Sequence, residues 1–119
     1  MKIQTLRLTI IGLLMFTGVF HLAVAFLNAA PGLGWPIAGF GLVYTVLSFY
    51  VRRDTNDGSK SHSRNAIIAA IAACSAGLAL GGNHYLANGG PGALVPMFII
   101  DVAIIAAAVM WLLRMRAKA

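Results

Sequence analysis

Three polar residues inside long apolar runs of this sequence could do chemistry together: Asp101, His21 and His84. A carboxylate within the hydrocarbon of a membrane costs at least about 2.5 kcal/mol on insertion scales, so Asp101 needs a polar partner or water. Histidine changes charge near neutral pH and also binds metals. The set therefore indicates a structural polar cluster, a path for a proton or ion, or a metal site.

Helix geometry predicts that these side chains lie in the same half of the bundle. Asp101 follows the start of its run at Pro96 by about 7 Å at 1.5 Å per residue. His21 lies about 10 Å before the end of its own run, and His84 lies about one turn before the end of the third run. With the adjacent Tyr85, they form the predicted polar intramembrane site.

Cofactor binding at this site remains an alternative. Two imidazoles and a carboxylate suit Zn²⁺ or Fe²⁺, and His21 and His84 lie on the same side, as two axial ligands of haem b would. However, no local pair of metal ligands spaced i, i+3 or i, i+4 supports such a site. We therefore predict no cofactor, and keep haem b or a divalent metal at His21, His84 and Asp101 as alternatives.

Motifs of several enzyme classes are missing from the sequence. It contains no phosphate-binding loop of the G-x-x-x-x-G-K-[ST] type, and no H-E-x-x-H, G-x-S-x-G or C-x-x-C. The one cysteine, Cys74, is surrounded by alanines and is expected to be a buried, inert thiol. These observations favour a protein that is not an enzyme.

The elements that must position the polar site are membrane-spanning helices. Of 119 residues, 60% are hydrophobic and 10% are charged, against about 25% charged in soluble domains. Four apolar runs approach the roughly 20 residues that a spanning helix needs: Leu6–Leu27, Trp35–Val51, Asn65–Leu86 and Val95–Leu113. Aromatic residues expected to anchor these helices at the membrane interface are Trp35, Tyr44, Tyr50, Tyr85 and Trp111. The sequence predicts an all-α integral membrane protein with a four-helix bundle.

The distribution of basic residues predicts the topology. All nine lie near the chain ends or in the middle linker, and none falls in the two short connections. The positive-inside rule then places both termini and the linker in the cytoplasm, as in a multi-pass protein of the inner membrane. This placement accounts for the net charge of +6 without nucleic acid as a partner. The basic residues are Lys2, Arg7, Arg52, Arg53, Lys60, Arg64, Arg114, Arg116 and Lys118.

The two short connections share the pattern N-x-x-P-G-x-x-x-P at an offset of 60 residues. Asparagine, proline and glycine are common in turns, yet the gap-free match at equivalent places favours a duplicated helical hairpin with parallel copies. The predicted units are hairpins 1–51 and 65–119, joined by a polar linker at 52–64. Gly41 then occupies the place in the first copy that Asp101 has in the second, either leaving open space opposite Asp101 together with Gly39 or serving only as a contact point for a neighbouring helix. The matched turn residues are Asn28, Pro31, Gly32 and Pro36, and Asn88, Pro91, Gly92 and Pro96.

A ladder of small residues runs along the third apolar segment. Ala69, Ala73, Gly77 and Gly81 recur every four residues, and helices approach closely along such faces. The ladder serves either packing within the bundle or self-association.

Three functional hypotheses follow. The first is a transporter or channel-like protein for a small solute, proton or metal ion that uses Asp101 with His21 and His84. The second is a non-catalytic accessory or assembly subunit of a larger membrane complex. The third is a haem- or metal-binding redox protein of the membrane. The expected partners are the lipid bilayer and either further copies of the chain or another membrane protein.

Overall fold

The computed structural model describes residues 3–27, 33–53, 61–89, 92 and 94–118 of the chain. Its helices are α1 (Ile3–Phe26), α2 (Gly34–Arg53), α3 (Ser61–Asn88) and α4 (Leu94–Lys118). Each of these four helices is long and apolar enough to cross a membrane. The predicted all-α four-helix bundle is therefore confirmed for the described residues.

The helices extend into the polar residues that flank the apolar runs. α2 continues through Arg53 and α3 begins at Ser61, so both ends of the predicted 52–64 linker are helical, while residues 54–60 lie outside the described part. A polar side chain at a helix end leaves the backbone hydrogen bonds of the helix intact. Hydropathy therefore marks the apolar part of each helix rather than its ends.

Several predicted turn residues lie at helix ends. Pro36 and Pro96 are in the first turns of α2 and α4, where a backbone N–H has no partner within the helix. Asn88 ends α3, and Gly89 follows with a φ of 70° and donates its N–H to the Tyr85 carbonyl at 2.7 Å. This is a left-handed C-terminal cap, which favours glycine. Of the other predicted turn residues, Gly92 lies in a turn, and Asn28, Pro31, Gly32 and Pro91 are outside the described residues.

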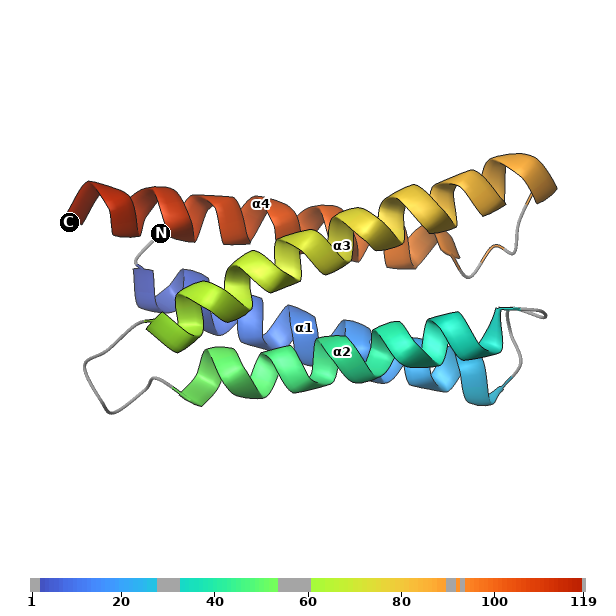
Figure 1. The fold of residues 1–119 in the computed structure, drawn as a ribbon, viewed down its shortest axis with the longest axis horizontal. Helices are drawn as coiled ribbons and strands as arrows, with labels where there is room; N and C mark the ends of the chain where they lie inside the picture. Colours follow the sequence, from blue (N-terminus) through green and yellow to red (C-terminus); the bar gives the residue numbers. More distant parts are fainter. Residues whose placement is uncertain (1–2, 28–32, 54–60, 90–91, 93, 119) are drawn as a thin grey trace.

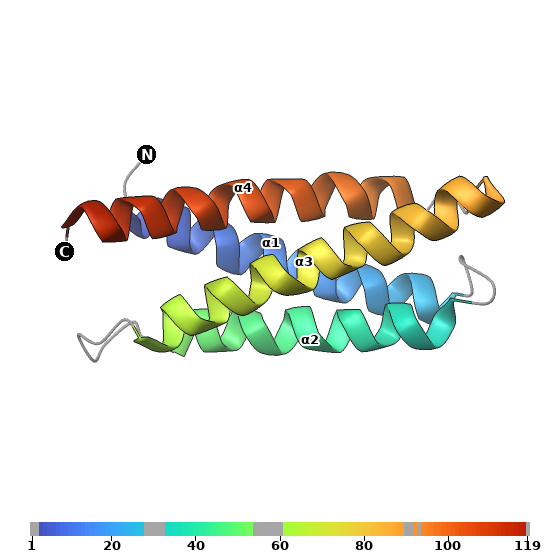
Figure 2. The ribbon, with the colours of Figure 1, turned by 45° about the horizontal axis from the view of Figure 1, so that its top comes forward.

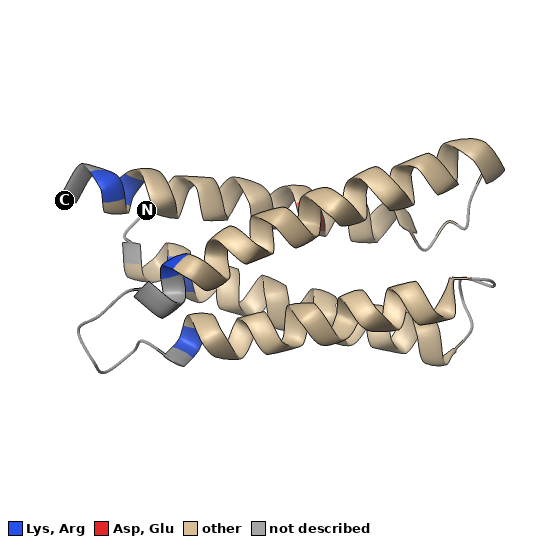
Figure 3. Cartoon of the chain, in the orientation of Figure 1, with Lys and Arg blue, Asp and Glu red and all other residues tan. Residues whose placement is uncertain are grey.

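Each helix packs against two others, in the cycle α1, α2, α3, α4 and back to α1. Figures 1 and 2 show that α3 lies beside α2 near the start of α3 and diverges from it along its length. Both chain termini lie at one end of the bundle (Figure 1), and the described Lys and Arg residues gather there (Figure 3). We call this end the basic end, and the end with the α1–α2 and α3–α4 connections the turn end.

The main core fills the part of the bundle toward the basic end. It includes Leu14 of α1, Ile67 of α3 and Ile104 of α4, all without exposed surface. Tyr44 and Trp111 belong to the same core and are also completely buried, so their prediction as interface anchors is wrong. Both side chains point into the bundle, and α4 continues beyond Trp111, which therefore does not lie at a helix end.

The α1–α2 hairpin is held together by a close backbone approach at Gly18 and Gly41. A Cβ atom at Gly18 would lie 3.0 Å from the carbonyl oxygen of Gly41, and a Cβ atom at Gly41 would lie 2.9 Å from the carbonyl oxygen of Gly18. Such distances leave no room for a side chain at either Gly18 or Gly41. The sequence allowed two interpretations of Gly41, open space opposite Asp101 or a contact with a neighbouring helix. The structure shows the contact, which is with α1.

The α3–α4 hairpin lacks this pair of glycines. Sixty residues after Gly18 and Gly41 stand Leu78 and Asp101, whose side chains are too large for the same backbone approach. Accordingly, α3 and α4 pack less extensively than α1 and α2.

Arg7 does more than mark topology, because its buried guanidinium caps the C-terminus of α2. Its Nε and NH2 groups donate to the Val51 carbonyl at 3.1 and 2.6 Å, and NH2 donates to the Arg52 carbonyl at 3.3 Å. The last carbonyls of a helix lack partners within the helix and carry partial negative charge, which a cation stabilises.

We expect Arg7→Met to lower the free energy of unfolding by about 2 kcal/mol, because hydrogen bonds from a charged donor contribute about 1.5–3 kcal/mol. SDS titration of the protein in mixed micelles measures this change. Arg64→Met is the matched control, since Arg64 is exposed at the same end. Equal stability of the two variants would contradict a capping role for Arg7.

Candidate functional site

Asp101 is the centre of a buried polar cluster formed by α2, α3 and α4. The Tyr44 hydroxyl lies 3.3 Å from Asp101 Oδ1 and 3.4 Å from the Ala73 carbonyl oxygen, in reach of both acceptors. The thiol of Cys74 interacts with both Tyr44 and Asp101. The partner that the buried carboxylate requires is thus a tyrosine hydroxyl on the neighbouring hairpin, with a thiol beside it.

His21 joins this cluster from α1 through the ring of Tyr44. The two rings meet edge to face, with centroids 5.1 Å apart and an interplanar angle of 67°. The His21 Nδ1 lies 2.7 Å from the Thr17 carbonyl oxygen, and because a carbonyl only accepts, Nδ1 carries the hydrogen. In the neutral ring Nε2 is then the acceptor. His21 therefore contacts the cluster at Tyr44, and its Nδ1 hydrogen bond stays within α1.

The other two predicted site residues lie nearer the turn end. His84 is half-buried, and the Asn88 side-chain amide donates to the His84 carbonyl at 2.9 Å. Tyr85 packs edge to face on Phe98, with centroids 6.1 Å apart and an interplanar angle of 79°. Tyr85 thus supports a wall of the site rather than the polar cluster itself.

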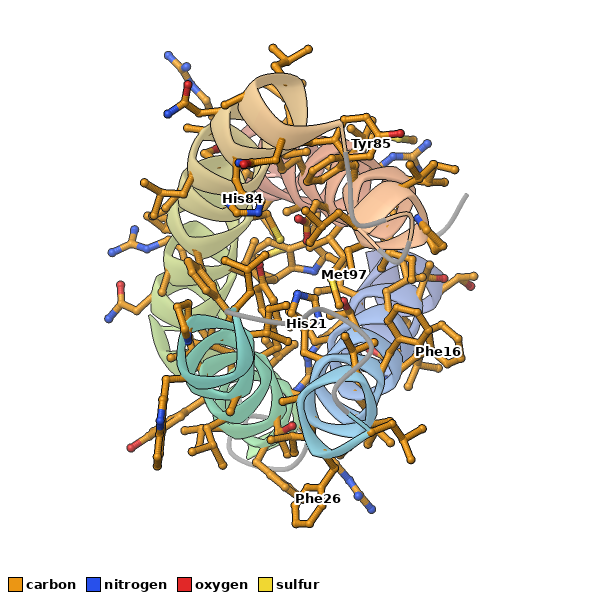
Figure 4. All side chains as sticks on the ribbon, turned by 90° about the vertical axis from the view of Figure 1, so that its right-hand side faces the viewer. Phe16, His21, Phe26, His84, Tyr85 and Met97 are labelled. Atoms are coloured by element: carbon orange, nitrogen blue, oxygen red, sulfur yellow. The ribbon has the colours of Figure 1, made fainter. Side chains whose placement is uncertain are left out.

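A cavity of about 490 Å³ brings three of the predicted site residues together. His21, His84 and Asp101 all line it, and it extends from the turn end to the Asp101 carboxyl. Figure 4 looks onto the turn end and shows His21 and Met97 pointing into the ring of helices, whereas Phe16 and Phe26 point outward. The remaining lining residues are Leu33, Pro36, Ile37, Phe40, Gly77, Leu80, Gly81, Asn83, Ala87, Asn88, Leu94, Met97 and Phe98.

Two glycines of α3 allow side chains of α2 and α4 to pack close to its backbone along the cavity. A Cβ atom at Gly77 would lie 3.2 Å from Tyr44 Oη, 3.4 Å from Asp101 Oδ2 and 3.8 Å from Phe40 Cε1. A Cβ atom at Gly81 would lie 2.9 Å from Phe98 Cε1. These two members of the small-residue ladder face the interior of their own bundle. Of the other two, Ala73 is half-buried and Ala69 is exposed.

The charge on the cavity wall has one sign. Among the described lining residues Asp101 is the one carboxylate and none is Lys or Arg, so the wall has one sign of charge while His21 and His84 are neutral. Within the described part of the chain, no group of three or more His, Cys, Asp or Glu residues could hold a metal ion. The arrangement suits binding of a small solute beside a carboxyl group in surroundings that are otherwise mostly apolar.

Tyr44, Cys74, Phe40 and Phe98 are the site residues that sequence reasoning missed. Tyr44 lies in the middle of its apolar run, whereas interface anchors lie at the ends of a membrane span. This position was the signal in the sequence that Tyr44 is not an interface anchor.

Comparison with known proteins gives no further indication of function, since no protein-family model, curated protein or solved structure matches the chain.

Proposed function

We propose that this chain is a small transporter of the inner membrane that binds a small solute at Asp101. The observation that carries the proposal is the cavity that runs from the turn end and stops at this carboxyl group. Its volume falls within the roughly 300–1,000 Å³ of small-molecule sites. Beyond Asp101, the packed core of Leu14, Ile67 and Ile104 closes the bundle toward the basic end. A site open to one side only is what one state of an alternating-access carrier requires.

The proposed orientation places the basic end in the cytoplasm, in accordance with the positive-inside rule. Figure 3 supports it, because the described basic residues gather at this end, away from the mouth of the cavity. The cavity then opens to the outer side of the membrane, and Asp101 is the group that a solute from outside reaches last.

Duplication of a helical hairpin explains why the site is asymmetric. Buried positions of α2 and α4 recur 60 residues apart: Ile37 and Met97, Gly41 and Asp101, Tyr44 and Ile104, Ser48 and Ala108, and Val51 and Trp111. α2 and α4 also begin 60 residues apart. These matches support parallel copies that present the same faces to the interior. At the position of Gly41 and Asp101, one copy kept the close helix contact and the other acquired a carboxylate.

Transport is tested with purified protein in liposomes, using four permeants: protons, Zn²⁺, glycerol and the fluorescent organic cation ethidium. We expect at least one to enter faster than into protein-free liposomes, and Asp101→Asn to slow that entry at least tenfold while the protein stays folded. Ser75→Ala is the control, because Ser75 is exposed on α3. The proposal fails if no permeant is accelerated or if Asp101→Asn leaves the flux unchanged.

The same purified sample separates the other two hypotheses. A Soret absorption band or a stoichiometric metal would favour the haem or metal protein, with His21 and His84 as ligands. Co-purification of one stable foreign membrane protein in mild detergent would favour the accessory subunit. Self-association of the chain also stays a prediction, and cross-linking in the same detergent measures it.

A further inference from the structure

We infer that the solute is a compact organic cation, an amine or quaternary ammonium ion with an apolar body. This inference rests on the proposed solute site and specifies its chemistry. The cationic group would lie beside the Asp101 carboxyl, and the apolar body would lie between the walls formed by α2, α3 and α4.

The sign of the charge follows from the groups around the cavity. Asp101 stands at its closed end, and the described lining residues include no Lys or Arg, so with His21 and His84 neutral none of them neutralises the carboxylate. The described Lys and Arg residues lie at the opposite end of the bundle (Figure 3). An anionic solute would meet a carboxylate in a poorly solvated site, where repulsion between like charges is weakly screened. A cation would offset the unfavourable burial of Asp101.

The size and the walls of the cavity favour an organic ion over a bare one. About 490 Å³ far exceeds what a proton or a metal ion occupies, and no group of three metal-ligating residues forms among those described. Apolar side chains from three helices cover much of the wall, among them Ile37 and Phe40, Leu80, and Leu94 and Phe98. Such a wall suits hydrocarbon rather than a hydrated ion.

An aromatic ring borders the same space as the carboxylate. Phe40 and Asp101 both line the cavity and lie close to the same point of α3, since a Cβ atom at Gly77 would be 3.4 Å from Asp101 Oδ2 and 3.8 Å from Phe40 Cε1. Aromatic rings attract cations, and quaternary ammonium ions are a frequent ligand of such sites. An ammonium group in the cavity could therefore lie next to Asp101 with the ring of Phe40 on a neighbouring wall.

Binding of a matched pair of probes tests the inference. (4-Hydroxyphenyl)trimethylammonium and 4-tert-butylphenol have the same shape and differ by a charged nitrogen in place of a carbon. Calorimetric titration of the protein in lipid nanodiscs should give a dissociation constant at least tenfold lower for the cation. Asp101→Asn should reduce this ratio to about one while binding of the neutral probe remains, which shows that the cavity is intact. The anion 4-hydroxybenzenesulfonate should bind more weakly than both.

The outcomes distinguish this inference from the proposed function. Equal binding of the two probes by the unsubstituted protein, or tighter binding of the sulfonate, would overturn the inference. A cation preference that survives Asp101→Asn would overturn it as well. Selective binding without accelerated flux of any of the four permeants in liposomes would support the ligand class and overturn transport. Flux of glycerol or Zn²⁺ without selective binding of the cation would support transport and overturn the ligand class.

Discussion

Gly18→Ala is expected to lower the free energy of unfolding by about 2–3 kcal/mol, the upper part of the range for overpacking in a tightly packed interior. The added methyl group would lie 3.0 Å from the carbonyl oxygen of Gly41 and 3.0 Å from the backbone nitrogen of Thr45. Both are backbone atoms, so relief requires the α1 and α2 helices to move apart. SDS titration in mixed micelles, followed by circular dichroism, measures the change.

Gly12→Ala is the matched control for this prediction on the same helix. A Cβ atom at Gly12 would have no heavy atom within 4 Å. Alanine also favours helix over glycine by up to about 1 kcal/mol, so this variant should be as stable as the unsubstituted protein or more stable. If both alanine variants are equally stable, the close approach of α1 and α2 at Gly18 is refuted.

The number of helices and the depth of the polar residues were accessible from sequence. Hydrocarbon demands long apolar runs, and these predict four helices without reference to tertiary contacts. Depth along a helix follows from a fixed rise per residue. Counting residues was therefore enough to place Asp101, His21 and His84 in the same half of the bundle, and all three line the cavity.

The direction in which a side chain points around its helix was not accessible. A soluble helix shows its buried face by an apolar stripe, but a helix with lipid outside and a core inside is apolar on all sides. Nothing in the apolar run around Tyr44 distinguishes a ring that faces Asp101 from one that faces lipid. The same ambiguity concealed the contacts of Cys74 and of Phe40, and it left two interpretations open for Gly41.

Gly77 lines the closed end of the cavity, where its lack of a side chain lets Tyr44 and Asp101 pack close to the backbone of α3. We expect Gly77→Leu to reduce binding of (4-hydroxyphenyl)trimethylammonium, and the flux of any permeant that the protein accelerates, at least tenfold. The leucine side chain would start 3.2 Å from Tyr44 Oη and 3.4 Å from Asp101 Oδ2, so it would fill the position proposed for the cationic group. Tyr44 and Asp101 must shift to admit this side chain, so circular dichroism is used to establish that the variant is folded before its binding is compared.

Gly82→Leu controls for the general effect of a leucine on α3. A Cβ atom at Gly82 would have no heavy atom within 4 Å, and the residue does not line the cavity. This variant should bind the cation and support flux like the unsubstituted protein. Gly77→Ala should be intermediate, because one methyl group requires Tyr44 and Asp101 to shift by only a few tenths of an ångström. If Gly77→Leu folds and binds the cation as tightly as Gly82→Leu does, the solute cannot lie between Gly77, Phe40 and Asp101, and the binding site must be sought elsewhere on the bundle.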